Sequence, residues 1–321
     1  MRCLITGATG FIGRQLAVRL ISKGHIVRLL LRGKDKLPPE FDQRDIRIGD
    51  ITVRESLEGM CDSIDVVFHC AGLLGGFSVP KLEYSRVNVS GTQNVIKEAK
   101  KAAVKKFVFI SSAGVIGPTG DLPAHEGSPC FPSNDYERSK LLAERLVVES
   151  GLNYVIIRPE FVYGKEDLHV LELFRAIQKR RFLIIGSGSS ILHPTYIDDL
   201  ITALTLCLAE NVKNQIYLIA GPEHVTVKEF TQSIATMVGA HLLNFKVPVW
   251  LAMILAGVNE SFAHLLGREP LVTFQRVNFF TKSRAFNTSK SALSLLFRPR
   301  VKLQEGLIET IKFYRSRGYL K

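Results

Sequence analysis

Short apolar runs alternate with helix-like patterns over the first half of the chain. The apolar runs have the length of strands, and several are apolar nearly throughout. Parallel strands that helices cover on both faces have this character. The order of strands and helices therefore predicts an α/β protein with a doubly wound parallel sheet. Strands are predicted at 2–6, 26–31, 46–50, 65–72, 106–112 and 153–159, and helices at about 11–23, 82–103 and 136–149.

Three glycines, Gly7, Gly10 and Gly13, lie between the first predicted strand and the first predicted helix. Glycine lets the backbone turn tightly and approach a pyrophosphate, and the start of a helix offers N–H groups and the positive end of its dipole. The spacing is GxxGxxG rather than the GxGxxG of other dinucleotide-binding enzymes. In this position the glycines predict a Rossmann-type domain that binds a dinucleotide.

The regular alternation loosens after about residue 160, where more loops and a late helix-rich stretch follow. We therefore assign residues 1–160 to the Rossmann domain, which is expected to include part of 194–222 as well. Residues 161–321 are assigned mainly to a smaller C-terminal substrate lobe that is partly interleaved with the sheet.

The end of the second strand in such domains normally carries an acidic residue that binds the ribose 2′-hydroxyl of NAD. Leu31 and Arg32 stand there in this chain, and Lys34 and Lys36 follow. A guanidinium beside the adenosine ribose can bind a 2′-phosphate through two hydrogen bonds. The sequence therefore favours NADP(H) over NAD(H). Asp50 is placed to accept a hydrogen bond from the adenine amino group.

Three further segments follow the glycine loop in order: FHCAGLLGG at 68–76, FVFISSAGVIG at 107–117 and DYERSK at 135–140. Together with the glycine loop they resemble the extended short-chain dehydrogenase/reductase family, over essentially the whole chain. That family includes nucleotide-sugar epimerases and dehydratases, dihydroflavonol reductases and 3β-hydroxysteroid dehydrogenases. The resemblance implies an NAD(P)-dependent oxidoreductase or epimerase.

The resemblance also implies the site residues. The family's catalytic serine, tyrosine and lysine fall on Ser112, Tyr136 and Lys140, and Asn88 matches an asparagine that the family keeps on the preceding helix. The segment 158–164 matches the one that lies beside the nicotinamide. The expected cofactor-binding residues are Gly7, Thr9, Gly10, Phe11, Ile12, Gly13, Arg32, Asp50, Ile51, Cys70, Ala71, Gly72, Asn88, Tyr136, Lys140, Pro159 and Val162.

Tyr136 and Lys140 are four residues apart at the start of a predicted helix, a spacing that solvated surface pairs also show. Hydride transfer to or from a carbon that bears oxygen needs a group that exchanges a proton with that oxygen. A free phenol has a pKa of about 10, too high for a base at neutral pH. We expect the Lys140 ammonium and the positive nicotinamide ring to lower that pKa, and Ser112 to hold the substrate oxygen.

Two substrate classes remain open. Nucleotide-sugar epimerases usually carry an Arg-Asp pair before an HVDD-like segment, and the arginine grips the diphosphate. This chain has Leu192 and His193 in those places, although Arg276 or Arg284 could replace the missing arginine. Glu160 either faces the pocket or serves in a salt bridge.

The segment 247–291 resembles the corresponding part of bacterial 3β-hydroxysteroid or sterol dehydrogenases, including a GREP turn. We therefore expect a hydrophobic, sterol- or terpenoid-like alcohol or ketone, with a nucleotide sugar as the alternative. A non-catalytic dinucleotide-binding regulator is less favoured, because such proteins generally lose the tyrosine or the lysine.

The amino-acid composition limits the class of protein and its expected location, but it does not indicate a reaction. The hydrophobic fraction of 46% and the charged fraction of 22% are typical of a folded soluble protein. Five scattered cysteines without a CxxC pair indicate neither a disulfide framework nor a zinc site, so we expect a reducing, cytoplasmic location and no metal. The first predicted strand begins at the second residue, so no targeting segment is expected.

The net charge of +12 suggests anionic partners, but the basic residues are spread along the chain, which argues against nucleic acid. A phosphate-bearing cofactor or an acidic membrane surface fits as well. The apolar run 247–258 is shorter than the roughly 20 residues that span a bilayer. Peripheral contact with a membrane surface and a homodimer are both compatible with the sequence.

Overall fold

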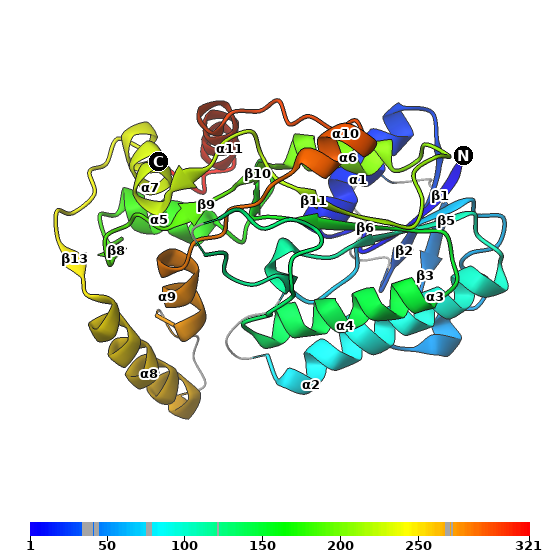
Figure 1. Cartoon of the computed structure of the whole chain (residues 1–321), viewed down its shortest axis with the longest axis horizontal. Coiled ribbons are helices and arrows are strands. Elements are labelled where there is room, and N and C mark those ends of the chain that lie inside the picture. Colours follow the sequence, from blue (N-terminus) through cyan, green and yellow to red (C-terminus); the bar gives the residue numbers. More distant parts are fainter. Residues whose placement is uncertain (34–40, 42–44, 75–78, 121, 267–269, 271) are drawn as a thin grey trace.

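A parallel sheet forms the centre of the protein, with helices on both of its faces (Figure 1). The structure is a computed structural model that describes residues 1–33, 41, 45–74, 79–120, 122–266, 270 and 272–321. Within these residues the sheet order is β11-β6-β5-β4-β1-β2-β3, and every neighbouring pair is parallel. The doubly wound Rossmann-type fold is thus confirmed. The strands are β1 (Arg2–Thr6), β2 (Ile26–Leu31), β3 (Asp45–Ile48), β4 (Val66–His69), β5 (Lys106–Ile110), β6 (Tyr154–Pro159) and β11 (Gln215–Ile219).

The core has two layers because successive side chains of a strand point to opposite faces. On β5, Val108 and Ile110 pack on one face, and Phe107 and Phe109 pack on the other. The first face is covered by α1 (Phe11–Ser22) and α6 (Ile197–Leu206), and the second by α3 (Gly91–Lys101) and α4 (Asp135–Glu149). Burial on both faces explains why these strands are apolar nearly throughout.

The predicted helix at 82–103 is not one regular α-helix. It consists of α2 (Lys81–Tyr84), a π-helical segment at Ser85–Ser90 and α3. The π-helical segment contains Asn88, which is 1% exposed and hydrogen-bonded to Ser139 and to the backbone of Leu73. Single π turns inside α-helices are frequent at functional sites. The irregularity was not visible in the hydrophobic pattern, which continues across it.

The second half of the chain adds further elements, and most of them lie beyond the carboxyl ends of the strands (Figure 1). They are β7 (Val162–Tyr163), α5 (Leu171–Gln178), β8 (Ile184–Ile185), β9 (Ile191–Leu192), β10 (Thr195–Tyr196), β12 (Val225–Thr226), α7 (Val227–Met237), β13 (Lys246–Val247), α8 (Val249–Leu266), α9 (Phe274–Thr281), α10 (Ser289–Ser294) and α11 (Leu303–Ser316). Strand β11 lies beside β6, so the chain returns to the sheet after residue 161. The division into a cofactor domain and a substrate lobe stays a prediction.

Candidate active site

The glycine loop brings backbone very close to backbone. Gly7 has a φ of +71°, and a Cβ added there would lie 2.6 Å from the Ala71 nitrogen. A Cβ on Gly13 would lie 2.3 Å from the Gly7 oxygen. Helix α1 starts after Gly10 without a side-chain cap, so its first N–H groups are left for another acceptor. This cradle fits the pyrophosphate of a dinucleotide.

The adenosine end of the predicted site holds Arg32 and Asp50. Thr52 donates two hydrogen bonds of 2.8 Å to the Asp50 carboxylate, one from its nitrogen and one from its hydroxyl. Partial burial raises the pKa of Asp50, but these hydrogen bonds and the charges of Arg32 and Arg86 outweigh it and hold the pKa below its usual value. Arg32 is exposed and lies within electrostatic range of Asp50. Lys34 and Lys36 lie outside the described residues.

The loop after β4 meets the π-helical segment and helix α4. A Cβ on Gly72 would lie 3.3 Å from the Asn88 Oδ1 and 3.7 Å from the Lys140 Nζ. The Asn88 amide donates to the Ser139 hydroxyl at 2.8 Å, and Ser139 donates to the Tyr136 carbonyl at 2.7 Å. Asn88 therefore ties the loop of Cys70, Ala71 and Gly72 to the turn of α4 that carries Tyr136 and Lys140. Ile51, another of the expected cofactor-binding residues, packs against the start of α3.

The three predicted catalytic residues come from two adjacent elements. Ser112 follows β5 and accepts a hydrogen bond of 3.0 Å from the Gly114 nitrogen, which fixes its hydroxyl. The same side chain hydrogen-bonds the Tyr136 phenol. The Lys140 Nζ lies 4.3 Å from the centre of the Phe109 ring on β5. Sequence positions 112, 136 and 140 thus converge at the carboxyl end of the sheet, where doubly wound folds bind ligands.

Burial dominates the electrostatics of this group. It raises the pKa of the Tyr136 phenol, as do the Glu137, Tyr84 and Glu160 side chains, whereas the hydrogen bond from Ser112 lowers it. Burial also lowers the pKa of Lys140 to about 8, against the opposing effects of Glu144 and Cys70. The sequence predicts that Lys140 lowers the pKa of Tyr136. In this structure desolvation has the largest effect on that pKa and raises it, because the phenol loses water when α4 packs on the sheet.

Glu137 and Arg284 form a buried ion pair beside the predicted catalytic residues. The Arg284 Nη2 donates to the Glu137 Oε1 at 2.8 Å, and Ser133 donates to the other carboxylate oxygen. Arg284 was a candidate to replace the missing phosphate-binding arginine, and this pairing with Glu137 directs it to the active site instead. Glu137 was missed, since a glutamate in the first turn of a helix usually serves the helix dipole.

The segment after β6 also reaches this site. Pro159 ends β6, Glu160 is 4% exposed, and Val162 is half-buried in β7. Burial raises the pKa of Glu160 to about 7, while the Arg284 charge lowers it and the Glu137 charge raises it. Glu160 makes no ion pair within the described part of the chain.

Buried or neutral side chains stand where nucleotide-sugar epimerases usually carry the diphosphate-binding arginine. Leu192 is fully buried in β9, and the Nε2–H of His193 donates a hydrogen bond of 2.8 Å to the Gly221 oxygen. Burial lowers the pKa of His193 to about 4, so this side chain is neutral at pH 7. Arg276 lies on α9 and donates to the Pro270 oxygen. Neither Leu192 nor His193 supplies a positive charge to a diphosphate.

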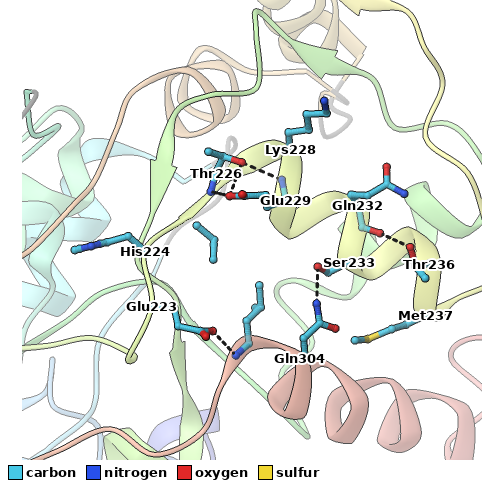
Figure 2. Close-up of a pocket in the computed structure, with 12 residues that line it drawn as sticks. Glu223, His224, Thr226, Lys228, Glu229, Gln232, Ser233, Thr236, Met237 and Gln304 are labelled. Carbon is cyan, nitrogen blue, oxygen red and sulfur yellow. Dashed lines mark hydrogen bonds between the residues drawn. The ribbon is translucent and has the colours of Figure 1, made fainter.

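A separate hollow of about 750 Å³ lies between β12, α7 and the start of α11 (Figure 2). Several of its polar groups bond to one another. Thr226 and Glu229 cap α7 reciprocally, Gln304 donates to Ser233, and Glu223 accepts from the Leu303 nitrogen. None of the predicted catalytic residues lines this hollow, so we do not assign the reaction to it.

The described residues contain neither a metal cluster nor a membrane-spanning helix. They contain no cluster of three His, Cys, Asp or Glu side chains that could hold a metal ion. Across the same part of the chain, no helix has the length and apolar character needed to cross a membrane.

Comparisons with known proteins identify the family. A model of the NAD dependent epimerase/dehydratase family matches residues 3–220. The 3 beta-hydroxysteroid dehydrogenase/Delta 5-->4-isomerase of Mycobacterium tuberculosis is 28% identical, over 98% of this chain and 90% of that protein. The 3beta-hydroxysteroid-dehydrogenase/decarboxylase isoform 1 of Arabidopsis thaliana is 30% identical, over 96% and 78%. The solved structure of MoeE5 in complex with UDP-glucose and NAD is 25% identical, with a TM-score of 0.76 over 99% of both chains.

The chain therefore belongs to the NAD dependent epimerase/dehydratase family. It is an NAD-dependent oxidoreductase or epimerase of the extended short-chain dehydrogenase/reductase type, which confirms the resemblance seen in its motifs.

Proposed function

We propose that this protein transfers a hydride between a nicotinamide cofactor and a secondary alcohol or ketone, with Tyr136 as the acid–base. The observation that carries the proposal is the convergence of Ser112, Tyr136 and Lys140 beside the glycine loop, at the carboxyl end of the sheet. The bound cofactor supplies the hydride donor or acceptor. The protein supplies the proton and holds the reacting oxygen.

Each residue has one role in this proposal. Tyr136 gives its proton to the carbonyl oxygen as a ketone is reduced, and takes it back in the reverse direction. Ser112 donates a hydrogen bond to the same oxygen and orients the phenol. Lys140 is half protonated near pH 8, so its charge can stabilise the phenolate there. Asn88 fixes the loop of Gly72 against Lys140.

We propose a hydrophobic, sterol- or terpenoid-like substrate rather than a nucleotide sugar. Buried Leu192 and neutral His193 take the place of the arginine that would bind a diphosphate. The two relatives named above are described as hydroxysteroid dehydrogenases, which supports this choice. MoeE5, solved with UDP-glucose, supports the nucleotide sugar as the alternative.

Thermal-shift measurements on the cofactor-bound protein test the substrate class. We expect stabilisation by sterol or terpenoid alcohols and ketones and little by UDP- or GDP-sugars, because ligand binding raises stability by an amount set by its concentration over Kd. An apolar ligand gains about 25 cal/mol for each Å² it buries. Strong stabilisation by a nucleotide sugar that Arg276→Ala or Arg284→Ala abolishes would favour the alternative.

We propose further that NADP(H) is preferred over NAD(H). The support is Arg32, which is exposed near Asp50 at the adenosine end, where other enzymes carry an acid. A 2′-phosphate can accept two hydrogen bonds from one guanidinium, and the 2′-hydroxyl of NAD cannot match that charge-assisted contact.

Substitution of Arg32 tests the cofactor preference. We expect the unmodified protein to bind NADPH more tightly than NADH, and Arg32→Ala to remove most of the difference by weakening NADPH alone. Fluorescence titration with each cofactor measures both affinities. Arg47→Ala, on the edge strand β3, is the control variant: it also removes one positive charge and should keep the preference for NADPH. Tighter binding of NADH by the unmodified protein would overturn the assignment.

The cytoplasmic location, contact with a membrane surface and a homodimer stay predictions. Helix α8 supports membrane contact, because it exposes Trp250, Ile254, Val258 and Phe262 at intervals of four residues. Flotation with anionic vesicles tests the membrane contact, and size-exclusion chromatography tests the homodimer.

A further inference from the structure

Two buried polar groups beside Tyr136 have no part in the proton transfer. The first is Glu160, whose backbone is fixed at the end of β6. Its nitrogen donates to the Ile219 oxygen at 3.0 Å, and its oxygen accepts from the Thr195 hydroxyl at 2.5 Å. Its side chain is almost wholly buried, and no described residue gives it a hydrogen bond. A mostly buried carboxyl that receives no hydrogen bond from the described residues needs an explanation, since loss of water is costly for a charged group.

The backbone at this point is strained. Phe161 has a φ of +28°, and its ring packs against Phe230 and Phe279 at centroid distances of 5.4 Å and 5.2 Å. Such a conformation persists in a residue with a large side chain only where the surroundings hold it, and it is commonest at functional sites. The strained turn fixes where Glu160 leaves the sheet.

The second group is Arg284. Its Nη2 is bonded to Glu137, but its Nε is buried and has no partner among the described residues. The Arg284 nitrogen donates to the Ile191 oxygen at 2.8 Å, and the neighbouring residues bond to Thr119. The guanidinium is therefore held in place from its backbone and from Glu137, with one N–H donor still unused.

Charge decides what these two groups can bind. The negative charges of Glu160 and Glu137 would repel a ligand that carries a carboxylate or a phosphate, and the positive charge of Arg284 would repel an ammonium group. Glu160 has a pKa of about 7, so its carboxyl can either accept or donate a hydrogen bond at neutral pH. A neutral oxygen that takes the Nε–H of Arg284 and bonds to Glu160 satisfies both groups.

We propose that Glu160 and Arg284 form a polar subsite for a second, neutral oxygen of the substrate, a hydroxyl close to the reacting carbon. Arg284 hydrogen-bonds Glu137, the residue that follows Tyr136, and Glu160 leaves the carboxyl end of β6, which the structure fixes against β11. The inference rests on the proposed function. The inference narrows the substrate class to hydroxy ketones and the corresponding diols whose remaining surface is hydrophobic.

Paired ketones test the subsite. We expect NADPH-dependent reduction of 2-hydroxycyclohexanone to exceed that of cyclohexanone by about 10- to 100-fold in kcat/KM, the usual worth of a hydrogen bond to a charged group. Glu160→Leu should reduce this ratio to about one, and Glu160→Gln should keep part of it. Glu305→Leu, exposed on α11, is the matched control and should keep both the ratio and the activity.

Binding separates the subsite from the reaction. Thermal shifts of the NADPH-bound Tyr136→Phe protein should be larger with the hydroxy ketone than with the plain ketone, and Glu160→Leu in that background should equalise them. Equal shifts before the second substitution would overturn the subsite. Unequal shifts together with no turnover of either ketone by the unmodified protein would support the subsite and contradict the proposed reaction.

Discussion

We expect Tyr136→Phe to lower turnover by about two to four orders of magnitude, the usual contribution of general acid–base catalysis. The substitution keeps the ring and removes the hydroxyl that hydrogen-bonds Ser112. Cofactor affinity should barely change, because the glycine loop and the Asn88 network do not involve that hydroxyl. Stopped-flow or steady-state NADPH absorbance with an identified substrate measures the loss.

Ser112→Ala provides the comparison for this variant. It removes one hydrogen bond to the reacting oxygen and leaves the phenol in place, so its turnover should fall less than that of Tyr136→Phe. Near-normal turnover by Tyr136→Phe would show that another group carries the proton. Glu160 would then be the next candidate, because it is a buried carboxyl within electrostatic range of Tyr136.

The largest expected loss of stability comes from breaking the Arg158–Glu144 pair. Arg158 on β6 donates to both oxygens of the Glu144 carboxylate on α4, at 2.9 Å and 2.6 Å. Both side chains are 4% exposed. Arg158→Met should lower the free energy of unfolding by about 3–5 kcal/mol, because it leaves a buried carboxylate without its partner. Urea titration followed by circular dichroism measures the change.

Two further variants show that the cost arises from the unpaired charge. The double variant Arg158→Met with Glu144→Leu should regain most of the lost stability, since no buried charge remains. Lys105→Met breaks an exposed ion pair with Asp65 and should leave the unfolding curve nearly unchanged. A single variant as stable as the unmodified protein would mean that water or another group compensates for Arg158.

The sequence predicted the sheet well because burial on both faces leaves a strong pattern. The predicted strands at 2–6 and 26–31 agree with β1 and β2 at both ends. The predicted strands at 65–72 and 106–112 were too long, because β4 ends at His69 and β5 at Ile110. The extra residues are the small ones that leave the sheet to form the site, and hydrophobicity alone does not mark that departure.

The predicted site residues depended on local motifs, which report neighbours in sequence and not in space. Gly72, Asn88 and Lys140 could be named one by one, yet their contact arises only when the loop after β4, the π-helical segment and α4 meet. The ion pair between Glu137 and Arg284 joins residues 147 positions apart. No pattern in one chain indicates such a pair, so the buried charges around Tyr136 could not be predicted.

The π-helical segment at Ser85–Ser90 makes this protein sensitive to changes in chain length. A π turn is equivalent to one residue inserted into an α-helix, so deleting one residue there would allow an unbroken helix from Lys81 to Lys101. Each residue turns an α-helix by about 100°, so the deletion would rotate Asn88 away from Leu73 and Ser139. A more regular helix would therefore gain stability at the expense of activity, a trade-off that proteins show where function needs an irregular backbone.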